Sequence, residues 1–544
     1  MFFWYNILAM NLIPTHDYIA YQPNMLLDFN FSYEKDVAVD DISRTVSEVV
    51  EGANLLKYVN FKNRNAHGYS GIMLLKIVLL AKTLFGYTST RSLAELCKND
   101  IRFIFIAQGA KPSHESFQRF IHDDLKMSID DIFYDINKYI EKHDEIETEI
   151  LYIDGTKYEA NANKMTFVWK KATLKFRMKC WKKCMEEIKK MNHTLESLDI
   201  PVRFSVIKEI SLDYLIEITD KLEEIMNMKE IKFVNGKGKR KHPLQRHYDV
   251  FKDSAIKMWK YAMHLDICGE RNSFSKTDPD ATFMHMKYDY YNHTNVFKPG
   301  YNVQMGVSDG YIRHIYISSD GNDLNTYIPF MKGYYEAYGK YPEKTPTDAG
   351  YGSYDNYSFC KENNIELYMK YSGQRKQAEK TTDKNRFKTW KFERNEDNEI
   401  ICPAGYKFEV ESERIETRGV YPRTIEKLIN PHCEGCPLRE KCTTSKKGRT
   451  ISRCQELEAY QNEVIKNMAS DEGKEIMNQR SIQSEGTFGN LKENWGYTKL
   501  RRRGESGVKT EIYLMSIGVN LRRYHHRKLE KQRQVEEILG QVLN

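Results

Sequence analysis

The pattern of apolar and polar positions predicts long helical stretches that interrupt a smaller set of strands. Residues 1 to about 140 follow a mainly helical pattern. In GIMLLKIVLLAKTLFGY, Leu74, Val78 and Leu79 share one helical face, which predicts a core helix. Further helices are predicted after the TST capping signal at 88–90 and at KPSHESFQRFIHDDL. These short helices fit a helix-turn-helix DNA-binding unit and a plain helical bundle equally well.

Strand patterns appear in two places. Four apolar residues, Ile150 to Ile153, run directly into Asp154, which predicts a buried strand that ends in a carboxylate. In GYNVQMGVSDGYIRHIYISSD, apolar residues alternate with polar ones up to a Ser-Asp-Gly turn, and a second apolar run follows. This segment is predicted as a β-hairpin.

The remaining patterns complete a mixed architecture. DLNTYIPFMKGYYEAYG is predicted as a helix, and KTPTDAGYGSYDNYSFCKENNI as a short strand, a glycine-rich turn and a helix. We predict an α/β protein with a mixed-sheet core. The predicted units are a helical N-terminal domain with a DNA-binding role (1–140), a discontinuous catalytic core (141–164, 288–365 and 479–525), a basic helical insertion (165–287), a cysteine-containing insertion (366–478) and a basic C-terminal tail (526–544).

Bulk composition adds little to this picture. The chain has 544 residues, and its 83 basic and 76 acidic residues give a net charge of +7, so the position of the charges matters more than their sum. The most apolar window contains Lys76 and Lys82 and is shorter than the ~20 residues of a membrane span. The start, MFFWYNILAM, has no basic region and is not predicted as a signal peptide. A cytoplasmic protein without membrane association is expected, with its ten cysteines reduced or bound to metal.

Three acidic residues are candidates for chemistry. Asp154 ends its strand, Asp348 lies where TPTDAGYGSY enters a glycine turn, and Glu485 lies on a helical segment. Glu485 and Lys492 are seven residues apart, so they fall on nearly one line beside an apolar stripe. A simpler interpretation of Asp154, a strand-end cap of the following turn, is equally compatible with its position. Carboxylate oxygens suit Mg²⁺ or Mn²⁺, and two such ions can promote phosphodiester cleavage.

Longer motifs around these acids carry a resemblance. YIDGTKYEANANK, TDAGYGS and EGTFGNLKENWGYTKLRRRG resemble the DDE transposases of bacterial insertion sequences, and so do KPGYNVQMGVSDGYI and NDLNTYIPFM. The resemblance covers most of residues 60–525. It implies an RNase H-like catalytic core in which Asp154, Asp348 and Glu485 bind the metal ions. Lys492 is then expected to position the phosphate.

The chain departs from one signature of these enzymes. One branch has the pattern Tyr-x2-Arg-x3-Glu-x6-Lys, and here only the spacing from Glu485 to Lys492 is kept. Ser481 occupies the Arg position and Asn478 the Tyr position. Arg480 lies one residue before the position of the signature arginine. It can take the role of that arginine only if the helical turn before Glu485 is altered. The hairpin-forming cleavage route of that branch is therefore left open.

A cysteine group predicts a second metal site. Cys402, Cys433, Cys436 and Cys442 have the spacing of ligands for structural, tetrahedral Zn²⁺. Cys454 and His432 are rivals for the fourth position. The alternative is a small sub-domain with reduced cysteines.

Basic residues follow Glu485 closely. Arg480, Lys499, Arg501, Arg502 and Arg503 are predicted to contact DNA phosphates. The alternative for such a charge run is a solvated face.

The leading hypothesis is a transposase that binds terminal inverted repeats and target DNA, both double-stranded. It would cleave the element ends with two Mg²⁺ or Mn²⁺ ions and transfer the strands into the target. The resemblance alone implies a homodimer on DNA. The alternatives are an RNase H-like DNA nuclease without strand transfer and a non-catalytic, zinc-containing DNA-binding regulator. An inactive copy of the element is a further alternative.

Overall fold

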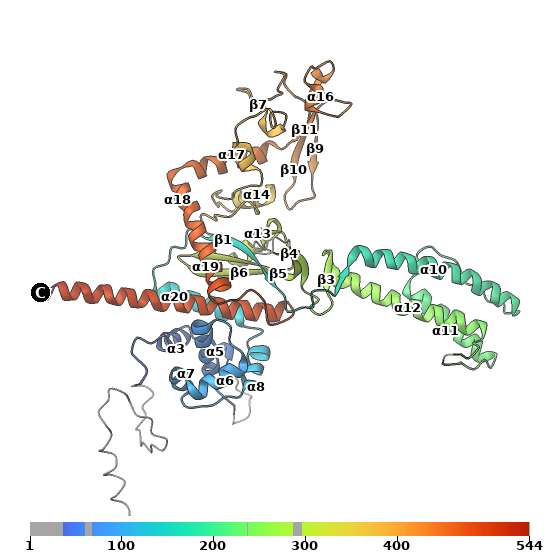
Figure 1. Cartoon of the computed structure of the whole chain (residues 1–544), viewed down its shortest axis with the longest axis horizontal. Helices are drawn as coiled ribbons and strands as arrows, with labels where there is room; N and C mark the ends of the chain where they lie inside the picture. The colour runs from blue at the N-terminus through green and yellow to red at the C-terminus, as the bar shows by residue number, and fades with distance from the viewer. Residues whose placement is uncertain (1–35, 60–67, 237, 287–295, 543–544) are drawn as a thin grey trace, which may run out of the picture.

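The structure, a computed structural model, describes residues 36–59, 68–236, 238–286 and 296–542 (Figure 1). The apolar start of the chain and the rest of residues 1–35 lie outside this range. The described part comprises a group of N-terminal helices, a central sheet, a projecting helical arm and a cysteine-containing region (Figure 1).

The N-terminal helices form where short polar residues can cap an amphipathic segment. Asp41 caps the first helix by accepting a hydrogen bond from the Ser43 amide at 2.8 Å, and Ser89 and Ser113 cap two later helices in the same way. The segment that contains Leu74, Val78 and Leu79 is a buried helix, as the sequence predicts. The bounds are α3 Ile42–Gly52, α4 Leu56–Val59, α5 Gly71–Phe85, α6 Thr90–Asn99, α7 Ile101–Ala107, α8 His114–Arg119, the π-helix η2 Phe120–Asp124 and α9 Ile129–His143.

None of the helices in the described ranges is by itself long and apolar enough to cross a membrane. The helices α5 and α6 pass the length and composition test only as a pair, which is bent by 96°.

The central sheet places Asp154 beside the predicted hairpin. Strand β5 lies between β1 and β6, antiparallel to both, and Asp154 pairs with Met305 in register. The hairpin is confirmed, and positive φ angles of 50° at Asp309 and 76° at Gly310 suit the tight turn that twisted strands need. The bounds are β1 Tyr152–Glu159, β4 Thr282–His285, β5 Phe297–Ser308 and β6 Tyr311–Ser318.

On its other side, β1 is joined by a short parallel segment that leads to Asp348. The Leu151 amide donates to the Lys344 carbonyl at 2.9 Å and the Ile153 amide to the Pro346 carbonyl at 3.1 Å. Proline has no N–H to donate, and the segment forms isolated bridges in place of the predicted strand. Thr347 bridges in turn to Met369, so two parallel segments extend the sheet beyond β1.

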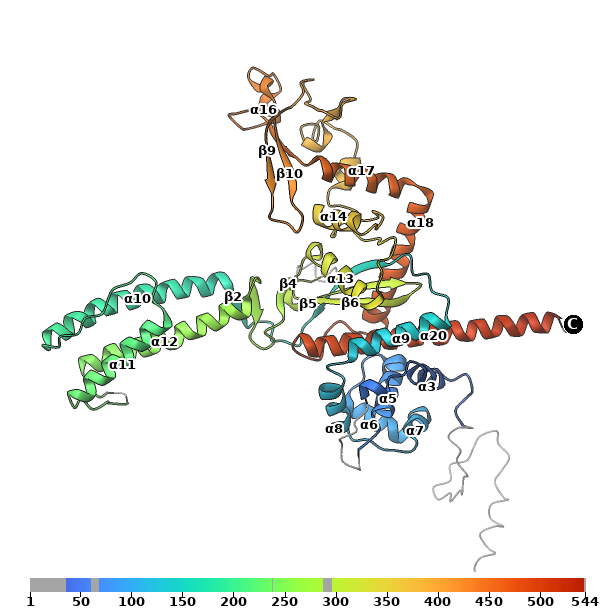
Figure 2. The same cartoon turned by 180° about the vertical axis from the view of Figure 1, so that it is seen from behind.

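A helical arm follows β1 and projects from the sheet (Figures 1 and 2). Its helices pack on a hydrophobic core of their own, which includes Cys184, Leu215 and Phe251. Although residues 282–285 lie in the stretch predicted as an insertion, they form β4 and pair with β5 of the central sheet. The bounds are β2 Phe167–Trp169, α10 Lys170–Ser197, α11 Leu212–Met228, α12 Pro243–Cys268 and β3 Ser273–Ser275.

Helices cover one face of the sheet before the chain enters the cysteine-containing region. Leu151, which directly precedes β1, and Ile153 of β1 pack against these helices. Their bounds are η3 Asp323–Asn325, α13 Tyr327–Tyr338, α14 Tyr354–Glu362 and α15 Gln374–Ala378. The cysteine-containing region comprises η4 Thr389–Lys391, β7 Glu393–Arg394, β8 Ile400–Ile401, β9 Glu409–Glu416, β10 Arg423–Ile429, η5 Pro431–Cys433, α16 Arg439–Cys442 and β11 Thr450–Arg453.

The chain then returns to the sheet through a bent helical run and ends in one long helix. The helical run comprises α17 Gln455–Ala469, α18 Asp471–Arg480, the π-helix η6 Ser481–Glu485, α19 Gly486–Gly489 and the π-helix η7 Asn490–Asn494. The last helix, α20 Glu505–Val542, lies between the sheet and the N-terminal helices, beside α9, and continues through the residues predicted as a tail (Figure 2).

Buried Asp144 ties these layers together. It follows α9, and its carboxylate lies 2.9 Å from Arg527 Nε and 2.8 Å from Lys531 Nζ of α20. It also accepts a hydrogen bond of 2.7 Å from the Tyr311 hydroxyl of β6. One carboxylate thus holds a helix, the sheet and α20 in a fixed arrangement.

Candidate active site

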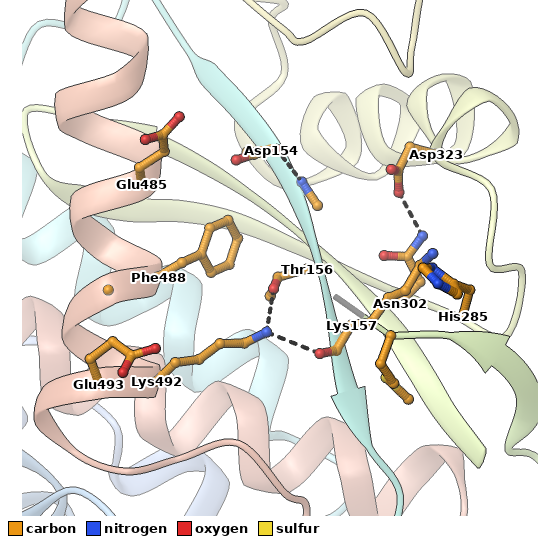
Figure 3. Close-up of a pocket in the computed structure, with 13 residues that line it drawn as sticks. Asp154, Thr156, Lys157, His285, Asn302, Asp323, Glu485, Phe488, Lys492 and Glu493 are labelled. Carbon is orange, nitrogen blue, oxygen red and sulfur yellow. Dashed lines mark hydrogen bonds between the residues drawn. The ribbon is translucent and has the colours of Figure 1, made fainter. Parts of the chain in front are cut away.

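A hollow of about 730 Å³ lies between β1 and the helical run that contains Glu485. Figure 3 shows Glu485, Phe488 and Lys492 projecting from the helical run toward β1, and Asp323 and Asn302 beyond the strand. The lining comes from β1, the end of β4, β5, η3 and residues 485–493. Three of the predicted site residues, Asp154, Glu485 and Lys492, therefore line one hollow, although Asp154 lies more than 300 residues before the other two in the chain.

Asp154 is partly enclosed, with a side chain that is 19% exposed. Its Oδ1 accepts a hydrogen bond from the Gly155 amide at 2.9 Å, and its Oδ2 lies 3.8 Å from Arg480 Nη1. Burial raises the pKa of Asp154 to about 6; Arg480 opposes this rise, while the carboxylates of Asp348 and Asp323 reinforce it. Asp154 thus lies among like charges, with the Arg480 guanidinium beside it.

Asp348 lies next to this hollow without lining it. Its Oδ1 accepts a hydrogen bond from the Gly350 amide at 2.8 Å. A Cβ atom on Gly350 would lie 3.0 Å from Asp348 Oδ1 and 3.6 Å from Asp323 Oδ2, so both carboxylates border this glycine. The structure therefore brings Asp348 close to Asp154 and adds Asp323 to the group.

A π-helical turn positions Arg480 next to Glu485. In an α-helix residues four apart face each other, whereas the wider π-turn brings residues five apart into line. Residues Ser481–Glu485 form such a turn, and Arg480 Nη2 lies 3.5 Å from Glu485 Oε1. The displaced arginine of the sequence thus regains the neighbourhood of the glutamate. Glu485 itself is 64% exposed, and Arg480 only 13%.

Lys492 reaches back to β1. Its Nζ donates a hydrogen bond of 2.5 Å to Thr156 Oγ1 and one of 3.0 Å to the Lys157 carbonyl. The ammonium also lies 4.7 Å from the centre of the Tyr158 ring. A cation is therefore held two to three residues along β1 from Asp154.

A buried polar network that the sequence pattern did not predict supports these carboxylates. Asp323 Oδ1 accepts hydrogen bonds from Asn302 at 2.7 Å and from Gln304 at 2.9 Å, and the Tyr351 hydroxyl bonds to Gln304. Asn302, Gln304 and Tyr351 are fully buried. The available signal was the polar face of β5, which alternation alone would assign to solvent.

The carboxylates have the donor chemistry of a divalent-cation site. The guanidinium of Arg480 lies between Asp154 and Glu485, and its Nη1 is buried without a hydrogen-bond partner among the described residues. As the side chains stand, no group of three or more His, Cys, Asp or Glu residues in the described ranges is arranged to hold an ion. The case for a divalent cation at this site therefore rests on the carboxylate oxygens and on their unbalanced negative charge.

The four predicted zinc ligands also come together. Cys402, Cys433, Cys436 and Cys442 line a small hollow of about 20 Å³, a volume sufficient for one small atom, although as the side chains stand these described residues are not arranged to hold an ion. Burial raises the pKa of the Cys442 thiol; Arg449 opposes the rise, and the other three thiols reinforce it. Of the rival ligands, His432 lines this hollow and Cys454 does not. Four thiols have the donor chemistry for Zn²⁺, and the site stays a prediction.

The predicted DNA contacts lie in three places. Arg480 belongs to the acidic site, as described above. Lys499 lies 3.5 Å from Glu159 at the far end of β1. The remaining three, Arg501, Arg502 and Arg503, line a different hollow against the N-terminal helices.

Comparison with known families assigns a class to this chain. Residues 401–525 match the model described as "Transposase DDE domain", and residues 31–123 match "Transposase domain (DUF772)". The first match includes Glu485, Lys492 and the four cysteines, and it begins after Asp154 and Asp348. Two separate parts of the chain therefore match transposase domains, which supports an enzyme that acts on DNA.

Both matches are to transposase domains, and they confirm the resemblance of the sequence motifs to the DDE transposases of insertion sequences. Such enzymes bind DNA and generally use divalent metal ions such as Mg²⁺. No curated protein and no solved structure gives a significant match to this chain.

Proposed function

We propose that this transposase cleaves DNA at the ends of its element and joins the freed ends to target DNA. Asp154, Asp348 and Glu485 would hold two Mg²⁺ or Mn²⁺ ions. Terminal inverted repeats and target DNA are the proposed partners, bound by a homodimer.

The sheet supports an RNase H-like core. Strands β6, β5 and β1 are antiparallel neighbours, and the segments at 344–347 and 366–369 continue the sheet in parallel with β1. Asp154 comes from the central strand, and Asp348 comes from the end of the adjacent parallel segment. Both acids therefore reach the same edge from rigid backbone.

The observation that carries the proposal is the charge at this edge. Asp154, Asp348 and Glu485 come from three separate segments, and Arg480 is the one cation that lies between two of them. Bringing like charges together in a partly buried site is unfavourable unless a cation offsets them. A catalytic role explains this arrangement better than a strand-end cap does.

Within this site, each residue has a defined task. Divalent ions, when bound, activate the attacking water and stabilise the departing oxygen. Lys492, held by Thr156, contacts a phosphate next to the cleaved bond. The freed 3′-hydroxyl then attacks target DNA, so no covalent bond to the protein forms.

A cleavage assay with matched variants tests the proposal. The substrate is a labelled duplex that carries the element's own end, with Mg²⁺ present or absent. Asp154→Asn and Asp348→Asn keep the side-chain shape and remove the charge. Asp320→Asn is the control, because Asp320 is exposed and lies three residues before Asp323.

We expect both site variants to lose cleavage while their melting temperatures stay near that of wild type, and Asp320→Asn to remain active. Mn²⁺ should raise the melting temperature of the wild type and of the control but not of Asp154→Asn. Equal cleavage by wild type and Asp154→Asn would refute the assignment. Cleavage without joined products would favour a nuclease, and specific binding without cleavage would favour a regulator.

A further inference from the structure

A second hollow, of about 460 Å³, lies between the N-terminal helices and the loop that precedes α20. One wall consists of α5, the α5–α6 turn and η2, with Lys82, Tyr87 and His122. The opposite wall is the loop Arg501–Arg503 with Glu511 of α20. Segments about 400 residues apart in the chain thus form one pocket.

This pocket has an excess of positive charge. Lys82, Arg501, Arg502 and Arg503 line it, and Glu511 is the one carboxylate among its described lining residues. The Glu511 carboxylate is already engaged, because it accepts hydrogen bonds from the backbone amides of Arg501 and Arg502 at 2.8 to 3.0 Å.

Lys82 is the most unusual member of the group. Its side chain is only 5% exposed, and it forms no hydrogen bond or ion pair with any residue that the structure describes. Its Nζ lies 4.8 Å from the centre of the Tyr87 ring, and the Arg501 guanidinium lies 5.3 Å from the same ring. Glu511 favours the charge of this largely buried ammonium, but its carboxylate already accepts backbone amides and three arginines share the pocket. An anionic ligand would therefore offset the remaining cost of burying the charge.

The pocket continues into a neighbouring hollow on the N-terminal helices. The two hollows share Ser89, Thr90 and Gln118, and the second adds two arginines, a histidine and one carboxylate: Arg91, Arg119, His114 and Glu115. Ser89 caps α6, so the first amides of this ten-residue helix lie at the junction. The first amides of α6 and the basic side chains of the two hollows therefore form a continuous surface of hydrogen-bond donors and positive charge.

We propose that this pocket binds a phosphate of a DNA strand and thereby ties the N-terminal helices and the catalytic core to the same DNA. The ligand class rests on the function proposed above, but the metal site plays no part in the argument.

The position along β1 suits a bound duplex. Asn161, which lines the pocket, is seven residues beyond Asp154. At about 3.3 Å per residue the two residues are at most roughly 23 Å apart. That length corresponds to about seven nucleotide pairs at 3.4 Å each. A duplex with its end at Asp154 therefore extends as far as the pocket.

Salt-dependent binding by the full chain tests this proposal. Lys82→Met keeps the length of the side chain and removes its charge, and Arg502→Gln is a second variant in the same pocket. Lys98→Met is the control, because Lys98 is an exposed lysine of α6 that pairs with Glu95 at 2.8 Å. Fluorescence anisotropy follows a labelled duplex of the element end, without divalent ions, between about 50 and 200 mM KCl.

A lost phosphate contact reduces the slope of log K against log salt by about 0.9. We expect that reduction for Lys82→Met and for Arg502→Gln, and no change for Lys98→Met. Wild-type slopes in both pocket variants, with circular dichroism showing an intact fold, would overturn the proposal. Because no cleavage is measured, a failure of the metal-site proposal leaves this result unaffected.

Uncharged methylphosphonate linkages in the duplex show which DNA phosphate the pocket binds, and they distinguish a DNA phosphate from a free anion as the ligand. One methylphosphonate at a time is placed along the duplex, and one position should weaken binding by wild type but not by Lys82→Met. Inorganic phosphate is the competing probe. If it raises the melting temperature of wild type but not of Lys82→Met, and no linkage position is selective, the pocket serves a free anion and the proposal is wrong.

Discussion

Replacing Lys82 by methionine should stabilise the folded chain, although we expect the same change to weaken DNA binding. Burial lowers the pKa of Lys82 to about 8 from its ordinary value of 10.5, an effect that Glu511 opposes and Arg502 reinforces. Each pKa unit corresponds to about 1.4 kcal/mol. The charged lysine therefore costs the fold about 3 kcal/mol at pH 7, and methionine removes this cost.

The pH dependence distinguishes this cause from better packing. Because the pKa of Lys82 is lower in the folded than in the unfolded chain, the destabilisation is fully present below pH 8. It disappears as the pH rises from 8 to about 10.5, where both states lose the proton. The gain from Lys82→Met should therefore be largest at pH 7 and small at pH 10.

Thermal unfolding is a direct assay of this prediction. Lys82 lies on α5, whose buried residues share one hydrophobic core with α9 and α20. For a cooperative unit of this size, about 3 kcal/mol corresponds to an increase in melting temperature of roughly 6 to 12 °C. Lys98→Met should leave the melting temperature unchanged. A lower melting temperature for Lys82→Met at pH 7, or an equal gain at pH 7 and pH 10, would refute the reasoning.

Three further changes test other parts of the structure. Gly155→Ala places a Cβ atom 2.8 Å from Asp323 Oδ1, so we expect at least tenfold slower Mg²⁺-dependent cleavage in a folded protein, and wild-type rates would contradict this packing. Asp144→Asn leaves two cations of α20 without their carboxylate and should cost about 3 kcal/mol of unfolding free energy, measured by thermal melting. Elemental analysis should find one zinc per chain in wild type and in Cys454→Ser but not in Cys436→Ser, and a zinc-free wild type would contradict the thiol site.

The local pattern of apolar residues was sufficient to predict a strand at Asp154 and a helical segment at Glu485. The apolar run before Asp154 does lead into a strand, but the predicted end of that strand was wrong: β1 begins at Tyr152 and continues through Asp154 to Glu159, so Asp154 lies within the strand. Phe488 and Leu491 are buried as their helical spacing predicts, and the same spacing directs Glu485 and Lys492 into one hollow. These features depend on residues within two turns of each other, which is the range over which periodicity is informative.

The local sequence pattern could not predict features that depend on the hydrogen-bond pattern of a helix or on residues distant in the chain. The π-turn at 481–485 changes which residue faces Glu485, and no side chain in the turn marks it in the sequence. Alternation in β5 predicts a solvent-facing side, but Asn302 and Gln304 are buried because they support Asp323 from below. Lys82 looked like a polar interruption of an apolar helix, since its partners in the pocket are about 400 residues away.

The two ends of β1 carry opposite charge imbalances. At Asp154 three further carboxylates lie close to a single guanidinium, whereas beyond Glu159 four cations line a pocket with a single carboxylate, Glu511. Each imbalance is unfavourable in the isolated protein, and neither can relieve the other across a strand of this length, because salt screens charges beyond about 10 Å. Duplex DNA with divalent ions at its end offsets both charge imbalances. Its phosphates pair with the lysine and arginine side chains of the pocket, and the divalent ions pair with the carboxylates. The same strand then sets the distance between the site of cleavage and the phosphate that holds the DNA.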